Sequence, residues 1–599
     1  MVRQYGPRAA LAAILVFTAW VFWPVHGFGW VNYFDDRDFI TGNPGITSGL
    51  TSTSLRYIVS DQAYYATGGP LTWLSHLIDI ELYGMNPAGH HVTGLLIHLL
   101  NVVLLFVLMR RLTGAWPASA IVAALFAVHP LHVESVAWVS ARKDVLSTAF
   151  WLAALLQYHG YAARRSRRAY IAALLFCIAG LMSKPIVAVL PLTMLVLDFW
   201  PLGRFDVGRG RALASQVTRL VVEKTPFAAL GAAALWLVYL SQVGRGAIST
   251  AEPAPFSLRV SNAVVSYYEY LVKMIWPVGL SAFYPYRWQI PAGTVALAAA
   301  VLIALTVVAV VAVRRQPSLL AGWLWYLGTL LPVIGFIRIG GHALADRLTY
   351  VPFIGVFVAV VWAAASLAKR WRISPVAVTT VVVALVFALG VAARAQVETW
   401  QDDETLWRHA LDVNADNARA HGNLAALLTE QNRVREALPH YREALRLEPS
   451  EPKLHNNFGL VLLRNGDRAG AMREFQEAVR LDPDYGRAHA NLADVLAAEG
   501  RFDEAFTYYR RAIDIDPARS GLARMNMAVT LAEVGRLDEA AAAAGTAIEI
   551  EPSRVDWRFT RAMMFKALGR RDEARRELVE VLRRQPAHVE AQRELAAIK

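Results

Sequence analysis

Eleven apolar runs in the first 395 residues constrain the fold more than any other feature of this sequence. Their lengths are close to the 20 or so residues that an α-helix needs to cross the hydrocarbon core of a membrane. The runs lie at 9–25, 91–109, 117–137, 145–162, 169–183, 185–200, 225–242, 292–313, 318–337, 349–368 and 374–393. We therefore predict an all-α protein whose residues 1–395 form a polytopic bundle of about eleven membrane spans.

The distribution of charge predicts how these spans are oriented. Residues 1–395 contain 30 Lys and Arg against 14 Asp and Glu, whereas residues 396–599 contain 30 against 34, so the net charge of +12 divides into +16 and −4. With the N-terminus inside, every predicted cytoplasmic loop is basic, as the positive-inside rule requires. The mildly acidic C-terminal part then lies outside, and its lack of a basic excess argues against nucleic acid as a partner.

One further apolar segment, Ser261 to Pro277, is predicted to lie on the outer surface as an interfacial or re-entrant helix. It contains Glu269 and Lys273, and a charge at mid-membrane costs about 3 kcal/mol. Counting the segment as a span would also place Arg314 and Arg315 on the outer side. The sequence alone leaves open whether this segment crosses the membrane.

The first outer loop carries a dense acidic cluster, Phe34-Asp35-Asp36-Arg37-Asp38, directly after the first span. Adjacent aspartates also occur in solvated turns and helix caps. Three carboxylates at a membrane surface are nevertheless hard to explain by packing, and a carboxylate can take a proton as a general base. We predict that Asp35 or Asp36 is catalytic and that neither contributes much to stability.

Ionisable residues recur where the outward-going spans end. Charges at a membrane rim are functional candidates, although Arg and Lys side chains also extend to the lipid headgroups for structural reasons. The cations that we single out are Arg142, Lys184 and Arg347. The other candidates at this rim are His129, His132, Glu134, Asp144, Arg338, His342, Asp346 and Tyr350.

The spacing of His129, His132 and Glu134 does not match a zinc site. The two histidines are three residues apart, but Pro130 interrupts the helix and Glu134 points elsewhere, unlike the i, i+4 histidine pair of zinc enzymes. Hydrogen-bonded histidines at a helix end explain the pattern better. The single cysteine, Cys177, lies in an apolar run and cannot form an internal disulfide.

A second architecture begins near Trp400, where the sequence becomes a tandem repeat. Prolines recur every 34 or 35 residues, which is the period of tetratricopeptide repeats, and the turn position holds Asn432, Gly466, Gly500, Gly535 and Gly569. We predict a connecting half repeat at 396–416, five repeats at 417–587 and a capping helix at 588–599, which together form a soluble α-solenoid.

Four asparagines occupy one register in the first helix of successive repeats: Asn423, Asn457, Asn491 and Asn526. Asparagine is unfavourable inside helices, so its recurrence needs a reason. One reason is hydrogen bonding between neighbouring helices of the solenoid. The other is that the amides hold the backbone of an extended polypeptide, because each amide offers a donor and an acceptor.

Several motifs together resemble the membrane-embedded C-type glycosyltransferases that carry tetratricopeptide repeats, such as the protein O-mannosyltransferases and their bacterial relatives. The resemblance spans nearly the whole chain. The matching motifs are Phe34-Asp35-Asp36, Phe126-Ala127-Val128-His129-Pro130 with Glu134, Val136-Ala137-Trp138, Arg142-Lys143-Asp144, Ser183-Lys184, Leu197-Asp198-Phe199-Trp200-Pro201, Ala345-Asp346-Arg347-Leu348-Thr349-Tyr350, Trp400 and Leu406-Trp407. Family members have an acidic neighbour beside the lysine at the fifth-to-sixth span turn, whereas here Lys184 is followed by Pro185.

This resemblance implies a sugar, mannose or another hexose, donated by a polyprenyl phosphate and accepted by Ser or Thr hydroxyls of proteins. The active site would face the non-cytoplasmic side, which for a bacterial inner membrane is the periplasm. Arg142, Lys184 and Arg347 are then candidates for binding the lipid phosphate, and the repeats for binding the acceptor polypeptide. No cofactor is predicted, and the sequence does not decide whether a divalent ion assists.

Two other functions share this architecture. A ligase or polymerase of lipid-linked oligosaccharides would transfer a preassembled glycan instead of one sugar. A membrane-anchored scaffold without catalysis would use only the repeats, and the charges at the outer rim would then be dispensable.

Overall fold

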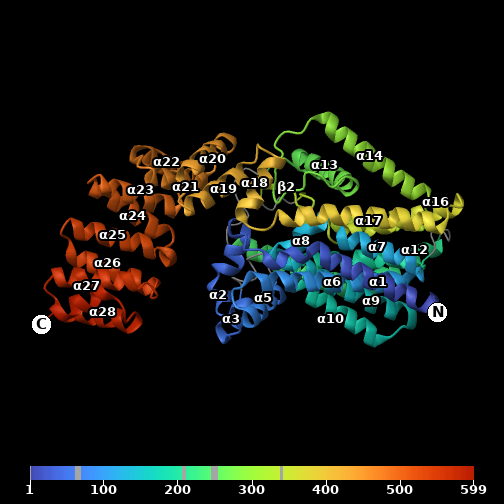
Figure 1. Cartoon of the computed structure of the whole chain (residues 1–599), viewed down its shortest axis with the longest axis horizontal. Coiled ribbons are helices and arrows are strands. Elements are labelled where there is room, and N and C mark those ends of the chain that lie inside the picture. Colours follow the sequence, from blue (N-terminus) through green and yellow to red (C-terminus); the bar gives the residue numbers. More distant parts are fainter. Residues whose placement is uncertain (1, 61–68, 206–210, 245–253, 337–340, 599) are drawn as a thin grey trace. The chain divides into compact units, whose positions relative to one another are not determined.

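The computed structural model describes residues 2–60, 69–205, 211–244, 254–336 and 341–598. The chain forms two compact units, Met1–Ala420 and His421–Lys599. Both consist almost entirely of helices, which confirms the predicted all-α class. Figure 1 shows a helix bundle in the first unit and stacked helix pairs in the second.

The first unit contains short helices and long ones, and one two-stranded antiparallel sheet in its described residues. Its α-helices are α1 (Val2–Phe22), α2 (Pro44–Thr47), α3 (Ser52–Ile58), α5 (Pro70–Tyr83), α6 (Pro87–Thr113), α7 (Trp116–Val128), α8 (Val133–Ala137), α9 (Arg142–Arg164), α10 (Arg167–Leu181), α11 (Leu190–Phe199), α12 (Arg211–Gly244), α13 (Phe256–Ile275), α14 (Ala292–Val311), α15 (Pro317–Leu330), α16 (Pro352–Arg370), α17 (Pro375–Glu398) and α18 (Asp403–Val413). Its other elements are the π-helix η2 (Asn32–Thr41), the 3₁₀ helices η1 (Trp23–Gly27), η3 (Pro130–His132), η4 (Val139–Ala141), η5 (Pro185–Val189) and η6 (Asp346–Thr349), and the strands β1 (Tyr284–Pro285) and β2 (His342–Leu344).

The second unit is a series of antiparallel helix pairs. The boundary between the units falls inside the first of these helices. They are α19 (Ala418–Glu430), α20 (Val434–Leu447), α21 (Pro452–Arg464), α22 (Arg468–Leu481), α23 (Gly486–Ala498), α24 (Phe502–Ile515), η7 (Pro517–Arg519), α25 (Gly521–Glu533), α26 (Leu537–Ile550), α27 (Val555–Ala567), α28 (Arg571–Arg584) and α29 (Val589–Ala597).

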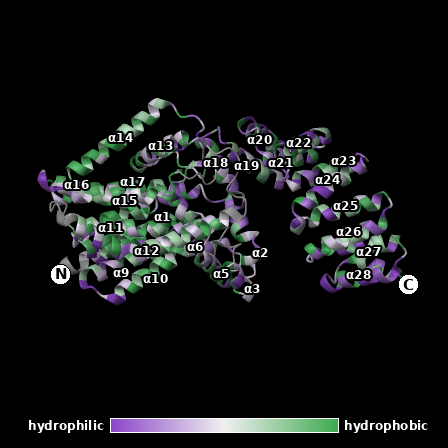
Figure 2. Cartoon of the chain, turned by 180° about the vertical axis from the view of Figure 1, so that it is seen from behind, coloured by the Kyte–Doolittle hydropathy of each residue, from purple (hydrophilic) through white to green (hydrophobic). Residues whose placement is uncertain are grey.

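Six described helices are long and apolar enough to cross a membrane, and they confirm a multi-pass protein. They are Gly6–Gly27, Pro87–Thr113, Ala214–Ser241, Ala292–Val311, Pro352–Arg370 and Pro375–Glu398; a seventh candidate is the pair Trp116–Val128 and Pro130–Ala137, bent by 58°. Figure 2 shows the hydrophobic colouring concentrated on such helices, for example along α14.

The other four predicted spans differ from simple membrane helices. Helices α10, α11 and α15 have 15, 10 and 14 residues, and at about 1.5 Å per residue each is shorter than the roughly 30 Å hydrocarbon core. Helix α9 has 23 residues but begins with Arg142, Lys143 and Asp144. Seven of the eleven predicted spans thus correspond to membrane-length apolar helices or to the bent pair, and for the other four the span stays a prediction.

The segment Ser261 to Pro277 forms most of α13, an amphipathic helix that is not among the membrane-length apolar helices described. Two of its tyrosines form hydrogen bonds with the helix bundle. The Tyr267 hydroxyl donates to the Leu327 carbonyl at 2.7 Å, and the Tyr270 hydroxyl donates to the Ala345 carbonyl at 3.0 Å. Helix α13 thus supports the segment that precedes η6.

Close helix contacts hold the bundle together where side chains are small. Gly322 on α15 and Gly355 on α16 face each other, and a Cβ atom at Gly322 would lie only 2.2 Å from the Gly355 carbonyl oxygen. Only glycine allows the two backbones to approach this closely. This contact fixes α16 and the η6 turn that leads into it.

The repeats show the predicted internal register. Asn432, Gly466, Gly500, Gly535 and Gly569 all have positive φ, between 61° and 85°, at the turn between the two helices of a pair. The alanines at the predicted close-contact positions, Ala444, Ala478, Ala512 and Ala547, are buried. The predicted connecting segment contains α18, which belongs to the first unit, and α29 packs against α28 at the C-terminal end.

Candidate functional site

Charged side chains from four parts of the first unit gather around the π-helix η2. Glu134 comes from α8, Lys143 and Asp144 from the start of α9, Lys184 from the turn before η5, and Arg347 from η6. Electrostatic interactions connect the Asp35 carboxylate on η2 with Lys143 and Arg347, and Lys143 with Lys184 and Asp144. The fold therefore brings together residues that lie more than 300 positions apart in the sequence.

Asp35 is an acidic residue of η2 that interacts electrostatically with these cations. Its side chain is half-buried, and no hydrogen bond to its carboxylate is found among the described residues. Burial raises the pKa of Asp35 above its usual value, while the neighbouring Lys143, Arg419 and Arg347 oppose that rise. A carboxylate with a raised pKa is a better proton acceptor than an exposed one.

Asp36 has a different role from the one predicted for it. Its side chain is 0% exposed; Oδ2 accepts the Val31 N–H at 3.0 Å, and Oδ1 accepts the Trp138 Nε1–H at 3.0 Å and the Ser140 N–H at 3.2 Å. Burial raises the pKa of Asp36 to about 6 despite these hydrogen bonds. Asp36 therefore anchors η2 on the turn between α8 and α9, and we expect its replacement to destabilise the protein.

Arg347 and Glu134 form an ion pair at the site. The Glu134 carboxylate accepts the Arg347 N–H at 2.8 Å and also binds its guanidinium group. The guanidinium lies 5.3 Å from the ring centre of Trp138. The Arg347 side chain is 17% exposed, so Glu134 and Trp138 hold this cation in place without enclosing it.

Lys184 and Asp144 form a second ion pair beside the first. The Lys184 side chain is 16% exposed. The other oxygen of Asp144, Oδ2, is buried and has no hydrogen-bond partner among the described residues. A buried carboxylate oxygen without a donor is costly, so this oxygen is able to accept a further hydrogen bond from a water molecule or a ligand.

Lys143 belongs to this charged group, although the sequence motif alone does not single it out. Its ammonium group lies 4.7 Å from the ring centre of Phe39 and 5.8 Å from that of Trp138. Lys143 and Arg142 are consecutive helical residues, so their side chains point about 100° apart. The sequence could not show which of the two faces Asp35.

Arg142 points away from the site, contrary to its predicted role in phosphate binding. Its side chain is 1% exposed, and its guanidinium donates to Ser75 Oγ at 2.8 Å, to Asp79 Oδ2 at 2.8 Å and to the His90 carbonyl at 2.6 Å. All of these bonds lie inside the bundle. Arg142 therefore joins α9 to α5 and α6.

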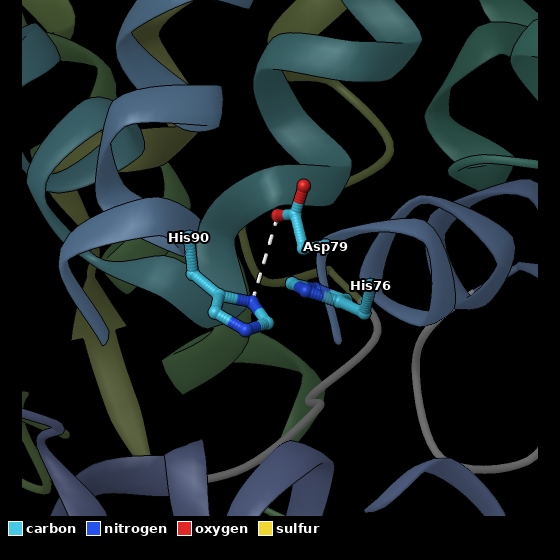
Figure 3. A group of neighbouring side chains, drawn as sticks. All are labelled: His76, Asp79 and His90. Carbon is cyan, nitrogen blue, oxygen red and sulfur yellow. Dashed lines mark ion pairs between the residues drawn. The ribbon is translucent and has the colours of Figure 1, made fainter. Parts of the chain in front are cut away.

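The same network contains a group that a metal ion could bind, formed by His76, Asp79 and His90 (Figure 3). All three side chains are buried, and their ligand atoms lie within 4.8 Å of one another. However, Asp79 already neutralises Arg142 through Oδ2 and accepts the Thr93 hydroxyl at 2.8 Å through Oδ1. A metal ion would have to share this carboxylate with a buried cation, so the donor set does not fit one.

Asp346 lies beside the Glu134–Arg347 pair. It accepts the Tyr284 hydroxyl at 2.9 Å, and burial together with the nearby Glu134 raises its pKa to about 8. Asp346 therefore takes up a proton more readily than an exposed aspartate does. His342 lies on β2, where its ring contacts Phe283, and burial lowers its pKa to about 4.

The other predicted rim residues serve the packing of the bundle. His129 binds the Met274 carbonyl at 2.9 Å, His132 binds the Phe126 carbonyl at 2.8 Å, and the Tyr350 hydroxyl lies 2.6 Å from His98 Nδ1. All three side chains are buried. We therefore assign these three residues a structural role. Arg338 lies outside the described residues.

The four asparagines of the repeats are half-buried, and they differ in their partners. Asn526 donates to both oxygens of Asp494, at 3.1 and 3.0 Å. Asn491 donates to Asn456 Oδ1 at 2.8 Å, and Asn456 donates to Asn457 Oδ1 at 3.3 Å. Bonds between neighbouring repeats thus explain Asn526 and part of the ladder, but leave donors on Asn457 and Asn423 that no described partner accounts for.

Comparisons with known proteins agree with this architecture. A family profile described as dolichyl-phosphate-mannose-protein mannosyltransferase matches residues 71–240. Tetratricopeptide-repeat profiles match residues 425–466, 456–520 and 496–558. The resemblance predicted from the sequence is therefore confirmed.

Similar curated proteins include the Homo sapiens protein O-mannosyl-transferases TMTC1 and TMTC4. TMTC1 is 24% identical over 463 residues, which cover 68% of this chain and 52% of that protein. TMTC4 is 26% identical over 465 residues, which cover 68% of this chain and 62% of that protein. The matched region thus spans less than two thirds of the length of either relative.

Solved structures of repeat proteins are similar to part of the chain. One is YrrB, described as a TPR protein with an unusual peptide-binding site: it is 26% identical and covers 31% of this chain and 96% of its own, with a TM-score of 0.27. Another is PilW, described as a type IV pilus biogenesis factor: it is 24% identical and covers 32% of this chain and 91% of its own, with a TM-score of 0.31.

Proposed function

We propose, because this chain is homologous to protein O-mannosyl-transferases and combines their mannosyltransferase region with tetratricopeptide repeats, that it is a membrane glycosyltransferase. Its donor is a hexose, mannose in the first instance, carried on a polyprenyl phosphate. Its acceptors are Ser and Thr hydroxyls of proteins. The observation that carries this proposal is the half-buried Asp35 carboxylate, which interacts electrostatically with the cations Lys143 and Arg347.

The reaction needs one proton acceptor. The acceptor hydroxyl oxygen attacks the anomeric carbon, the bond from that carbon to the phosphate oxygen breaks, and the phosphate leaves with the electron pair. Asp35 takes the hydroxyl proton, so that the attacking oxygen carries no positive charge in the product. Asp36 holds the π-helix through its buried hydrogen bonds and so fixes the position of its neighbour.

The leaving phosphate needs cations that the protein has already placed. Arg347 and Lys184 are each partly exposed and each held by one carboxylate, Glu134 and Asp144 respectively. Because these cations are already held in place, they stabilise the negative charge that develops on the leaving phosphate without moving in the transition state. Lys143 lies next to both the proton acceptor and Lys184, and we assign it to the phosphate as well.

The proposed location is a bacterial inner membrane, with the site and the repeats on the periplasmic side. The basic loops support it, for example Arg164 and Arg165 at the turn between α9 and α10. Reporter fusions after Arg165 and after Lys599 test this orientation. The first should report the cytoplasm and the second the periplasm; a cytoplasmic signal at Lys599 would contradict the proposal.

The repeats are proposed to bind the acceptor polypeptide. In the described structure, bonds to neighbouring repeats do not account for all of the asparagine donors in the first helices of the pairs. These amides can pair with the backbone of an extended segment whatever its sequence. This role explains why one chain carries both a membrane site and a solenoid.

A transfer assay with purified full-length protein tests the proposed reaction. Mannosyl-phosphoryl-polyprenol and an unfolded protein acceptor should give mannose bound to Ser and Thr. Transfer from a lipid-linked oligosaccharide alone would show a ligase instead. Absence of transfer from either donor, with the protein folded, would favour a membrane scaffold.

A further inference from the structure

Helix α18 contacts the π-helix that carries Asp35, although it follows the last membrane-length helix. The Asp403 carboxylate accepts the Asn32 N–H at 2.9 Å and the Tyr33 N–H at 2.8 Å, one bond on each oxygen. Asn32 and Tyr33 are the first two residues of η2. The first N–H groups of a helix have no partner within it, so Asp403 supplies two acceptors from a distant part of the sequence.

Aromatic side chains fix the same junction. The ring of Phe34 lies between those of Trp400 and Trp407, with ring centres 6.0 and 5.6 Å away. The Gly29 N–H also donates to the Gln401 carbonyl at 3.0 Å. Residues 400–407 thus contact the loop before η2 as well as η2 itself.

The continuation of this segment contacts another part of the site. His409 binds the Leu280 carbonyl at 2.9 Å, and the Asn417 side chain donates to the Phe283 carbonyl at 3.1 Å. The next residue after Phe283 is Tyr284, whose hydroxyl binds Asp346. The segment from Trp400 to Asn417 therefore joins the Asp35 part of the site to the Asp346 part.

We infer that Asp403 is a positioning residue of the active site: it closes the N-terminal end of η2 and thereby fixes where Asp35 points. This inference rests on the proposed function for its effect on catalysis, but the hydrogen bonds that carry it do not. Asp403 does not face the proposed reactants, because its two oxygens are occupied by backbone N–H groups. Its effect on catalysis passes through η2, the helix that carries Asp35.

Only a carboxylate suits this place among side chains of this size. An asparagine has one acceptor oxygen and one NH₂ group, so it can accept one of the two N–H groups and turns a donor toward the other. The partial positive charge at a helix N-terminus also favours an anion there. Asp403→Asn therefore loses a bond at nearly constant volume.

The charges around Asp403 make its contribution depend on pH. Burial raises the pKa of Asp403 to about 7; Asp36 on η2 and Asp402 on its own helix raise it too, and the Tyr33 and Asn32 N–H groups oppose the rise. The ionised form that accepts both bonds is therefore present above about pH 7. Acidification protonates one oxygen and releases one N–H group.

Hydrogen exchange of the full-length protein, read by mass spectrometry, tests the inference together with the transfer assay. In Asp403→Asn, the amides of residues 31–36 should exchange at least tenfold faster than in the wild type, and kcat should fall tenfold or more with the donor KM within twofold. Asp402→Asn is the matched control: its carboxylate caps α18 by accepting the Thr405 N–H at 2.8 Å, and both readouts should stay unchanged.

Unchanged exchange and unchanged kcat in Asp403→Asn would overturn the inference. Should that variant not fold, Asp403→Glu replaces it: the longer side chain displaces the carboxylate, and the effect should have the same direction, whereas wild-type values in both readouts would again overturn the inference. Exchange needs no activity. If the wild type transfers no sugar, the proposed function fails while exchange still decides whether Asp403 holds the loop.

Discussion

Two clusters of buried charge in the membrane unit differ in how completely their groups are paired. In the first cluster, both carboxylate oxygens of Asp198 are paired. The Tyr158 hydroxyl lies 2.7 and 2.8 Å from the two oxygens. Arg204 binds one oxygen at 3.0 Å and Lys224 binds the other at 2.5 Å. Glu223 adds further bonds to Arg204 at 2.7 and 2.8 Å. This cluster is closed and ties α9 and α11 to α12.

The cluster around Asp35 is open by comparison. Lys184 and Arg347 each have one carboxylate partner and partial exposure, Asp144 keeps an oxygen without a donor, and no hydrogen bond to Asp35 is found among the described residues. Buried charge alone therefore does not identify an active site, because structural networks are buried too. What distinguishes the site is charge that the protein holds in place but does not fully pair.

The largest effect on sugar transfer is expected for Asp35, which lies in the open cluster. Asp35→Asn removes the proton acceptor and should reduce sugar transfer about 100- to 10,000-fold with little change in thermal stability. Asp38→Asn, an exposed change in the same loop, is the control. In the wild type, activity should fall on acidification at a higher pH than an exposed aspartate would give, because the pKa of Asp35 is raised. If Asp35→Asn keeps its activity, another residue is the general base.

The closed cluster predicts the opposite result. Asp198→Asn leaves Arg204 and Lys224 buried without their carboxylate, and loss of one partner of a buried ion pair costs about 3–5 kcal/mol. The unfolding temperature and yield should drop strongly, while the donor KM of the folded fraction stays unchanged. A variant of normal stability that has lost donor affinity would show that this cluster binds substrate.

Lys184→Met tests whether a cation of the open cluster stabilises the leaving phosphate. Removing a preorganised charge from the leaving phosphate should reduce kcat about 10- to 100-fold. Lys369→Met, an exposed lysine in the last turn of α16, is the control with the same chemical change. If both variants behave alike, Lys184 only neutralises Asp144.

The smallest effect on sugar transfer is expected in the repeats, where some asparagine amides are paired within the protein and others are not. Asn423→Ala with Asn457→Ala should raise the KM for a polypeptide acceptor roughly tenfold, at about 1 kcal/mol for each lost hydrogen-bonding side chain. Transfer to a short peptide should not change. Asn526→Ala removes an amide already bound to Asp494 and should lower the unfolding temperature instead. If the double variant unfolds at a lower temperature but binds the acceptor with unaltered affinity, the asparagines have a structural role.

Periodic features of the fold could be predicted from the sequence. The 34-residue period fixed the repeats because each turn needs a residue that tolerates positive φ, as Gly466 and Asn432 do. The lengths of the helices in the membrane unit could not be predicted as well. The apolar run at 318–337, for example, contains a helix of only 14 residues, Pro317–Leu330.

The motifs select loops that the structure brings together, but they do not distinguish neighbouring residues. Asp36 is fully buried beside the half-buried Asp35, and Arg142 is bound inside the bundle beside Lys143. A motif does not show which side chain points inward. Asp403 was missed because its partners, Asn32 and Tyr33, lie about 370 residues earlier.

Sugar transfer to proteins by this chain can be measured by mass spectrometry of envelope and secreted proteins, in cells that carry either the wild-type chain or Asp35→Asn at equal membrane level. We expect single hexoses on Ser and Thr of specific proteins with the wild type, and their loss with Asp35→Asn. If the same hexoses occur in both cell lines, or in neither, this chain does not transfer them through Asp35.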